Sequence, residues 1–486
     1  MARSGGDRGC DRGRHRGRDR ALYRGAIEVR EHECARAPDP DPGLHRYRVH
    51  HPAGGLAGRG HHPLQRPARA RHHGAAHPAW RRAHRQSGQE SRADGGRHPA
   101  LLRQPDRAQQ LHAGAYEQAP TQAQDPAAQE WRLGMKSTDR FEVAGQAVPL
   151  GTIEDVRLPI SQTYAGDPIG IPMRVIRAER PGPRVFVTAA IHGDEINGTG
   201  IIHDFLFNER PQLVSGTLVL VPVINVFGFE THERYLPDRR DLNRSFPGSE
   251  NGSLASRIAH ILMTELVAKC DYGIDLHTAA VQRTNFPNIR ADLGNARARR
   301  LASAFGCMLT VDGKGPVGSF RREATKAGCP TIILEAGEPW KVEPSVLQIG
   351  IRGIRNVLSE LGMIDRPIEP PPFQVRIRKT FWVRAAVGGI LKFHVSPGDF
   401  VEADQAVATN YSIMGVEQSV LNSPGPGIVL GMATLPAVKP GEPICHIASL
   451  TEGQVRRYRK KLEATWTDLH AQVQQDLATN LDVVPG

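Results

Sequence analysis

Short apolar runs alternate with stretches of helical spacing through the middle of the chain. Apolar runs cover residues 185–191 and 218–224, and between them residues 201–206 place apolar side chains at helical spacing. Two later apolar runs, at residues 274–277 and 331–335, each end in an ionisable side chain. This alternation predicts an α/β sheet covered by helices. The ends of its strands form the edge at which open α/β sheets build their sites.

The pattern changes at a proline-rich stretch, residues 367–372, which marks a domain boundary. Beyond it, short runs separated by Gly and Pro turns form two similar halves and predict a small all-β domain over residues 373–449. This part resembles the barrel-sandwich fold of biotinyl and lipoyl carrier domains. It lacks the lysine that those carriers modify, because no lysine lies between Phe393 and Val438. We therefore interpret it as a lid or wall rather than a carrier.

The last predicted element is a C-terminal amphipathic helix over residues 450–480. Its apolar side chains, from Val455 to Leu477, recur at helical spacing and form one stripe. Two interpretations of the stripe stay open, a helix that packs on its own body and a dimer contact. The second would make the protein a homo-oligomer.

Composition separates the first 134 residues from the rest of the chain. They hold 24 Arg and no Lys against 14 Asp and Glu, so they carry +10 of the net charge of +11. They show neither helical nor strand periodicity, and their Arg, Gly, Pro, His and Ala content cannot build a core. Since the remaining residues are nearly neutral, the high overall charge does not indicate a nucleic-acid-binding protein.

Three interpretations compete for residues 1–134. The first is upstream GC-rich sequence translated in a wrong frame, with the natural start at Met135. The second is a disordered basic tail, and the third is an RNA-binding arm. Such arms usually interleave lysines or aromatic residues, whereas Trp80 and Trp131 stand far apart. We expect the first, and so expect no nucleic-acid partner.

The remaining 352 residues, 486 minus 134, suffice for one large and one small domain. No apolar run reaches the roughly 18 residues of a membrane span, and neither Met1 nor Met135 is followed by an apolar signal core. We therefore expect no membrane partner. The cysteines of this part are widely spaced, which predicts reduced, buried thiols in a cytoplasmic protein. They are Cys270, Cys307, Cys329 and Cys445.

A strand that ends in two candidate metal ligands is the most specific chemical feature. His192 and Glu195 lie where the apolar run of residues 185–191 gives way to a helix. His277 ends a later strand and completes a His, Glu, His set. Three protein ligands with an open fourth position are the arrangement of catalytic zinc, whereas structural zinc is normally closed by four ligands. Asp275 could orient one of the imidazoles, although the sequence does not say which.

Two further motifs accompany these ligands. The run Arg240–Gly248 (RDLNRSFPG) lies between the two ligand strands, and Leu334–Gly337 (LEAG) follows them. In this order the four pieces resemble the succinylglutamate desuccinylase and aspartoacylase family, which is related to the zinc carboxypeptidases. The resemblance covers residues 141–363. It implies a mixed-sheet, zinc-carboxypeptidase-like α/β catalytic domain, which we place at residues 135–366.

The resemblance implies that His192, Glu195 and His277 bind one zinc ion per chain. Zinc lowers the pKa of a bound water towards 7 and polarises an amide carbonyl. Glu335 matches the family's general base, a carboxylate that takes a proton from the water and passes it to the leaving nitrogen. Glu338 is the reserve candidate for this role.

The resemblance also implies which residues hold the substrate. Asn243 and Arg244 match the pair that binds a substrate carboxylate, a task that suits the two parallel donors of an arginine. The same segment has the composition of a capping turn, so a purely structural role stays open. Arg234 matches the arginine that stabilises the oxyanion. Arg239 and Arg240 are alternatives, because the spacing from Arg234 to Asn243 is slightly longer than in the aspartoacylase branch.

Together these features predict a zinc amidohydrolase that cleaves the amide bond of a small, carboxylate-bearing N-acyl amino acid. One alternative is a metallocarboxypeptidase acting on acidic peptide tails, which would use the same ligands and the same carboxylate clamp. The other is a catalytically silent ligand-binding module, which predicts that a ligand or the base is missing. This sequence has every ligand and a base, so we expect an enzyme that acts on a small molecule.

Overall fold

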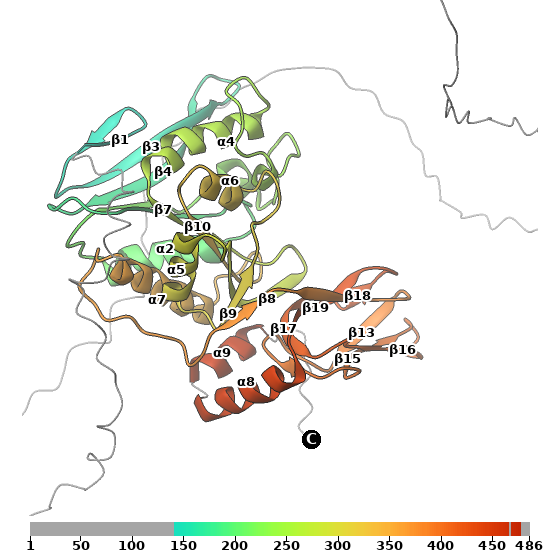
Figure 1. Cartoon of the computed structure of the whole chain (residues 1–486). Helices are drawn as coiled ribbons and strands as arrows, with labels where there is room; N and C mark the ends of the chain where they lie inside the picture. The colour runs from blue at the N-terminus through green and yellow to red at the C-terminus, as the bar shows by residue number, and fades with distance from the viewer. Residues whose placement is uncertain (1–139, 466–467, 478–486) are drawn as a thin grey trace, which may run out of the picture. The chain divides into compact units, whose positions relative to one another are not determined.

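The computed structural model describes residues 140–465 and 468–477 (Figure 1). The Arg-rich segment of residues 1–134 and the expected start at Met135 lie outside these ranges, and so does Trp466. Within them, no helix is long and apolar enough to cross a membrane. All four cysteines of the described part are buried and free, as the sequence predicted.

A mixed sheet forms the centre of the fold. Four parallel neighbours stand in its middle, in the order β6 (Thr217–Val221), β5 (Arg184–Ala189), β7 (Tyr272–His277) and β10 (Thr331–Gly337). β8 (Arg283–Ala291) continues the sheet antiparallel to β10. At the other side, β4 (Pro168–Arg177) and β3 (Ile153–Gln162) form an antiparallel hairpin beside β6. The mixed α/β sheet predicted from the sequence is confirmed.

Helices cover both faces of this sheet (Figure 1). On one face lie α2 (Asn197–Asp204), α5 (Ala296–Phe305) and α7 (Pro344–Glu360), and on the other α4 (Leu254–Glu265) and α6 (Phe320–Lys326). Successive side chains of a strand point to opposite faces, so those of β5 enter two separate apolar clusters, one under each helix layer. The shorter helices are η2 (Phe205–Glu209), α3 (Val226–Thr231), η3 (Leu242–Arg244) and η4 (Val267–Lys269).

The chain from residue 373 to residue 449 is all-β. Four of its strands form an antiparallel sheet in the order β16 (Glu417–Asn422), β15 (Ala406–Tyr411), β13 (Gly389–Phe393) and β18 (Ala437–Val438). Three more are antiparallel neighbours in the order β12 (Thr380–Arg384), β19 (Pro443–Ser449) and β17 (Gly427–Ala433). The two other strands of this part are β11 (Val375–Ile377) and β14 (Phe400–Val401). The short strands that precede it in the chain are β1 (Phe141–Val143), β2 (Gln146–Val148) and β9 (Leu309–Asp312).

The all-β part shares a sheet with the catalytic domain. β17 pairs antiparallel with β8, with Gly431 opposite Asn285, so β12, β19 and β17 extend the central sheet (Figure 1). Although residues 367–372 were expected to separate two domains, the backbone ladder crosses between them. The all-β part therefore has a fixed position beside the edge of the catalytic sheet.

The prediction of a single C-terminal helix over residues 450–480 is wrong in the number of helices. The described residues form two helices, α8 (Glu452–Thr465) and α9 (Asp468–Leu477), which Figure 1 shows running in different directions. Three members of the apolar stripe, Val455, Tyr458 and Val473, are buried in the core cluster beside the central sheet. Of the two interpretations, these residues confirm packing on the protein's own body.

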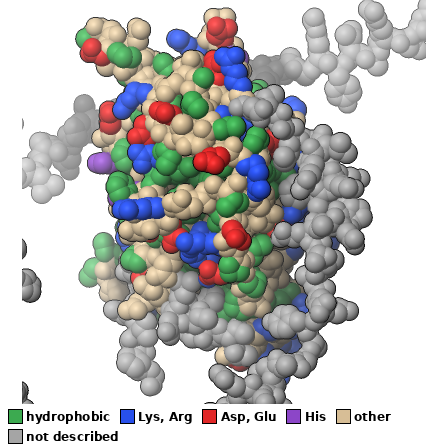
Figure 2. All heavy atoms as spheres, turned by 90° about the vertical axis from the view of Figure 1, so that its left-hand side faces the viewer, with side chains coloured by type: hydrophobic (Ala, Val, Ile, Leu, Met, Phe, Trp, Pro, Cys, Tyr) green, Lys and Arg blue, Asp and Glu red, His purple; other side chains and the backbone are tan. Residues whose placement is uncertain are grey.

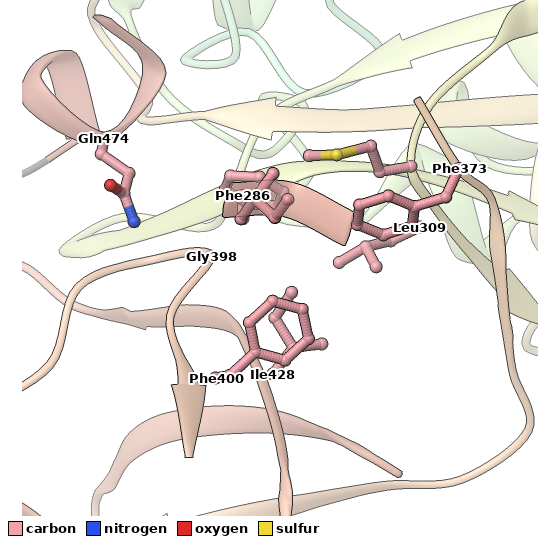
Figure 3. A pocket seen from close by; sticks show the side chains of 9 residues that line it. Phe286, Leu309, Phe373, Gly398, Phe400, Ile428 and Gln474 are labelled. Carbon is pink, nitrogen blue, oxygen red and sulfur yellow. The ribbon is translucent and has the colours of Figure 1, made fainter. Parts of the chain in front are cut away.

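An apolar junction joins these helices to the central sheet (Figure 3). Phe286 of β8, Phe373 and Phe400 of β14 surround a cavity of about 10 Å³ together with Gln474 of α9. A space of this size holds at most one water molecule. We interpret the junction as packing that fixes the all-β part, not as a ligand site.

Charged side chains of both signs are interspersed on the face shown in Figure 2, with apolar side chains between them. This agrees with the near-neutral charge of the chain after residue 134.

Candidate active site

The candidate metal ligands meet at the carboxyl edge of the parallel strands. Beyond the end of β5 the backbone turns at Ala190, which has a left-handed φ of 49°, and leads through His192 and Glu195 into α2. His277 is the last residue of the neighbouring strand β7. Gly193 is required in this turn, because a Cβ there would lie 1.9 Å from the carbonyl carbon of Gly228.

Each imidazole turns Nδ1 towards the carboxylate of Glu195. Nδ1 of His192 lies 2.7 Å from Glu195 Oε1, and Nδ1 of His277 lies 2.9 Å from Glu195 Oε2. One ligand atom from each of the three residues can be chosen so that all lie within 4.8 Å of one another. The three side chains are at most 4% exposed. The sequence prediction that these residues come together is therefore confirmed.

A second carboxylate contacts the far side of each imidazole. His277 Nε2 lies 2.8 Å from Asp275 Oδ2, and His192 Nε2 lies 3.1 Å from Asp241 Oδ1. The structure thus shows that Asp275 orients His277. Asp241, which lies in the RDLNRSFPG run, has the same role for His192. A carboxylate on the second ring nitrogen is the usual support of a metal-binding histidine, because it fixes the tautomer and orients the ring.

The electrostatics of the cluster keep Glu195 ionised. Burial raises the pKa of Glu195, but His192 and His277 together lower it by more than burial raises it. The net pKa therefore lies far below the ordinary value. For His277, burial lowers the pKa while Asp275 and Glu195 raise it, and the net pKa lies well above the ordinary value. Buried opposite charges therefore compensate one another in the protein as it stands.

These residues fit a zinc ion. His192 Nδ1 is buried and has no hydrogen-bond partner of good geometry in the described part of the chain, although Glu195 is close. Two imidazole nitrogens and one carboxylate oxygen are ligands that zinc prefers. A metal ion would accept the lone pairs of both Nδ1 atoms while their Nε2–H groups donate to Asp241 and Asp275. The cluster also lies in the wall of an open cavity, as a catalytic zinc site requires.

Glu335 is held beside the metal cluster by the sheet itself. It stands on β10 directly opposite His277 of β7 and lines the same cavity. Asn285 Nδ2 donates to Glu335 Oε2 at 2.9 Å, and Arg290 Nη1 lies 3.5 Å from Glu335 Oε1. Glu338, the reserve candidate, is not among the cavity-lining residues and pairs with Lys341 at 3.2 Å.

Of the three candidate oxyanion arginines, the structure brings one into the cavity. Arg234 lines it and donates to Glu195 Oε1 at 3.0 Å and to Asp241 Oδ2 at 3.2 Å. Arg239 and Arg240 are exposed outside the cavity lining, and Arg240 pairs with Asp238. The longer spacing to Asn243 therefore does not keep Arg234 out of the cavity.

The segment with Asn243 and Arg244 makes the contacts of a capping turn and also lines the cavity. Asp241 caps the turn η3 by accepting a hydrogen bond from Asn243 N at 2.8 Å, which is capping chemistry. Asn243 Oδ1 accepts from Phe320 N at 2.8 Å, so this side chain also fastens the start of α6. Both Asn243 and Arg244 line the cavity, where Arg244 is exposed.

The cavity has a volume of about 390 Å³, and one of its walls was not predicted from the sequence. That wall consists of Arg283, Asn285, Arg290, Arg321, Trp382 and His446. Trp382 and His446 come from the all-β part, where their rings stack at 4.2 Å and 5°. Arg283 and Asn285, two residues apart on β8, have the spacing of one strand face and were a visible sequence signal for part of this wall. The contribution of β12 and β19 had none, because it depends on pairing between distant strands.

The protein thus has a mixed α/β sheet with a His, Glu, His cluster and a further glutamate at one edge. This arrangement is a candidate metal centre of the hydrolase type. Residues 181–361 match the model of the succinylglutamate desuccinylase/aspartoacylase catalytic domain. The chain therefore carries a catalytic domain of the succinylglutamate desuccinylase/aspartoacylase family, which confirms the resemblance found in the sequence.

Relatives with known structures or activities support the same family. The N-alpha-acetyl-L-2,4-diaminobutyric acid deacetylase of Halomonas elongata is 27% identical over 315 residues, which are 61% of this chain and 91% of that protein. The product-bound ectoine utilization protein EutE (DoeB) from Ruegeria pomeroyi is 22% identical with a TM-score of 0.56, covering 62% of this chain and 98% of the other.

A succinylglutamate desuccinylase/aspartoacylase from Rhodobacter sphaeroides is also similar. It is 25% identical with a TM-score of 0.54, covering 61% of this chain and 95% of the other. These likenesses confirm the fold of the catalytic part.

Proposed function

We propose that the chain is a zinc-dependent hydrolase that cleaves the amide bond of a small, carboxylate-bearing N-acyl amino acid. The observation that carries this proposal is the buried cluster of His192, Glu195 and His277 in the wall of a cavity that Glu335 and Arg244 also line. A metal site, a general base and a carboxylate anchor around one small cavity are the parts that such a reaction needs.

Deacylation is favoured over the carboxypeptidase alternative by the relative from Halomonas elongata, whose name describes an N-acetyl amino acid deacetylase. The size of the cavity, about 390 Å³, suits a small molecule. The silent binding module is disfavoured because the described residues hold every ligand and a base around the cavity.

The chain's own residues divide the work of the reaction. Bound zinc supplies a Lewis acid that activates water and polarises the substrate carbonyl. Glu335 takes the proton of the attacking water and delivers it to the leaving nitrogen. Asn285 and Arg290 hold the two oxygens of Glu335 in place for both transfers. Arg234 stabilises the negative charge that develops on the carbonyl oxygen, and Asn243 with Arg244 anchors the substrate carboxylate.

Zinc content and hydrolysis of a panel of N-acyl amino acids and acidic dipeptides test this proposal. We expect about one zinc per chain and release of the acyl acid. H192A should lose both zinc and activity. E335Q should keep zinc but lower kcat by roughly 10²- to 10⁴-fold, the usual contribution of a general acid–base group.

E338Q is the matched control, because Glu338 lies on the same segment outside the cavity lining. Loss of activity in E338Q with full activity in E335Q would move the general base to Glu338. Full activity in an H192A protein that has lost its zinc would contradict zinc catalysis. Release of free amino acids from C-terminal glutamyl peptides alone would favour the carboxypeptidase.

A further inference from the structure

Exposed apolar side chains are concentrated on one sheet of the all-β part. Among the described residues, seventeen large apolar side chains are exposed, and seven of them lie within residues 387–435. These seven belong to the sheet of β16, β15, β13 and β18 or to the turns beside its strands: Val387, Ile390, Ile413, Met414, Val416, Val420 and Leu435. Single exposed apolar residues are common on protein surfaces, whereas a gathered set marks an interaction site.

This four-stranded sheet lies on the side of the all-β part away from the catalytic domain (Figure 1). Its strands send Leu391, Ala408 and Leu421 into the apolar cluster inside the all-β part. Because successive side chains of a strand alternate between faces, their neighbours Ile390 and Val420 point outward. The cavity wall comes from β12 and β19 of the other sheet, so the outer face is separate from the candidate active site.

The hairpin between β15 and β16 extends this face with an apolar tip of fixed shape. Ile413 is 88% exposed and Met414 84%, and Val416 completes the tip. Ser412 N donates to the Val416 carbonyl at 2.7 Å and Gly415 N to the Ser412 carbonyl at 2.9 Å. Val416 N donates in turn to Ser412 Oγ at 3.2 Å. These hydrogen bonds hold the turn in one arrangement, which lowers the entropy that a partner must remove on binding.

One positive and one negative side chain share the outer face with the apolar residues. The strand register forms one row from Ile390 through Tyr411 to Glu417, and the next row from Lys392 through Thr409 to Val420. Ile390 and Val420 therefore stand at opposite corners of the face, and Lys392 and Glu417 stand at the other two. Both charged side chains are exposed, and within the described ranges neither makes an ion pair.

We propose that this face, with its hairpin tip, binds the same face of a second copy of the chain. A twofold axis along the diagonal from Ile390 to Val420 places each apolar corner against its own copy. The same axis places Lys392 of each chain against Glu417 of the other. The strands of the two sheets then cross at nearly right angles, which is one of the two usual ways in which sheets pack. The face is thus complementary to itself in charge and in apolar surface.

Two other surfaces of the described chain are less suited to such a contact. In the C-terminal stripe, the first candidate for a dimer contact, Val455, Tyr458 and Val473 are buried in the protein's own core. At the edge of the central sheet, β3 carries the exposed charge of Asp155 and also Pro159, and charges and prolines on an edge strand oppose pairing with another chain.

Sedimentation velocity of the zinc-loaded full-length protein over a range of concentrations tests the proposal. We expect the wild type to associate into a dimer of its 53.2-kDa chains. I413S/M414S removes the apolar tip and should raise the dissociation constant at least about tenfold. I153S is the matched control, because Ile153 is an exposed isoleucine of β3 outside this face, and it should dimerise as the wild type does.

Charge reversal tests the position of the twofold axis. K392E and E417K each place like charges opposite one another at two points of the dimer, so each variant alone should dimerise at least about tenfold more weakly than the wild type. In an equimolar mixture of the two variants every acid again faces a lysine, so heterodimers should form. The double variant K392E/E417K should regain the affinity of the wild type for the same reason.

A wild type that stays monomeric at every concentration would overturn the proposal, and so would a dimer that I413S/M414S and both charge reversals leave unchanged. If a monomeric wild type cosedimented with phosphatidylcholine vesicles and I413S/M414S did not, the face would bind a lipid surface and the dimer would be refuted. All variants should keep the thermal midpoint and the hydrolytic activity of the wild type, because the face lies apart from the cavity. The outcome is therefore independent of whether the proposed function holds.

Discussion

Two aspartates set the orientation of the candidate zinc ligands. Asp275 contacts Nε2 of His277 and also accepts a hydrogen bond from Thr188 Oγ1 at 2.8 Å, so its own position is fixed by β5. Asp241 contacts Nε2 of His192 and also pairs with Arg234. A carboxylate on the outer ring nitrogen makes the imidazole a better metal ligand and leaves Nδ1 free for the ion.

Replacing Asp275 by asparagine should weaken zinc binding without removing a ligand. D275N keeps the shape of the side chain but loses its charge, and such changes typically lower metal affinity by roughly 10- to 100-fold. Competition with a chromophoric chelator measures the change directly. D155N, which removes an exposed carboxylate of β3, is the control and should bind zinc as the wild type does. Wild-type affinity in D275N would show that packing alone orients His277.

At this scale the sequence brought out the candidate ligands His192, Glu195 and His277 from their places at or just after the ends of apolar runs, and the candidate base Glu335 through the family resemblance. The supporting contacts were less accessible. Asp275 was recognised as an orienting residue, but its partner His277 depends on the rotamers that the fold selects. The choice of Arg234 over Arg239 and Arg240 likewise depends on how the loop folds back onto Glu195.

Strand pairing, rather than any single side chain, gives the cavity its composite wall. A row of opposite residues crosses four strands, from Trp382 through His446 and Gly431 to Asn285. Asn285 is the residue that donates to Glu335. The all-β part thus reaches the candidate general base through one backbone ladder.

Gly431 is the point at which this ladder constrains Asn285. A Cβ at Gly431 would lie 2.6 Å from Asn285 Oδ1 and 2.6 Å from the Thr284 carbonyl, so G431A must displace β17 or the amide of Asn285. Because Asn285 holds Glu335, we expect kcat to fall roughly tenfold while KM changes little, equivalent to about 1.4 kcal/mol of transition-state stabilisation. Steady-state kinetics on the preferred substrate measures both constants.

G388A provides the comparison within the same part of the chain. A Cβ at Gly388 would lie no closer than 3.4 Å to its neighbours, which is ordinary contact, so this variant should keep its kcat. If G431A lowered the thermal midpoint but left kcat unchanged, the link from β17 to Glu335 would be refuted.

Elements were predictable from periodicity, but their partners were not. The apolar runs correctly indicated β5, β6, β7 and β10, since buried parallel strands are nearly continuous in hydrophobic residues. The pairing of β17 with β8 joins segments far apart in the chain, and alternation of side chains does not specify which edge a strand will join. A break within the C-terminal stripe was equally hidden, because α8 and α9 both continue its apolar spacing.

At the scale of the whole molecule, the shared sheet fixes the all-β part to the catalytic domain. A proline-rich stretch normally marks a boundary that few contacts cross. Here the backbone ladder between β17 and β8 and the apolar junction of Figure 3 both cross it. The all-β part is therefore a fixed wall of the candidate active site, and its side chains experience the charges of the catalytic domain.

His446 shows this effect in its protonation. Burial, followed by the charges of Arg290 and Arg283, lowers the pKa of His446 from 6.5 to about 4. Both arginines belong to β8 of the catalytic domain, and the stacked Trp382 offers no negative charge in return. The folded protein therefore keeps His446 neutral in a pH range where the unfolded chain binds a proton.

Because only the unfolded chain protonates His446 readily, the free energy of unfolding depends on pH. Above pH 6.5 His446 is neutral in the folded and in the unfolded protein, so it does not change the free energy of unfolding. As the pH falls from 6.5 to about 4, the unfolded chain takes up a proton that the folded protein refuses, so the free energy of unfolding decreases. At 1.36 kcal/mol per pKa unit, and with allowance for partial exposure to solvent, we expect a loss of about 2 kcal/mol.

Urea unfolding of the wild type and H446Q at pH 7.5 and pH 4.5 measures this loss. Other groups of the folded and unfolded chain also titrate in this range, but they do so in both proteins, so the difference between the two isolates His446. We expect the wild type to lose about 2 kcal/mol more than H446Q on acidification, because glutamine cannot take up the proton. An equal loss in both proteins would show that His446 protonates freely in the folded state, and hence that the arginine-rich wall is not closed around it.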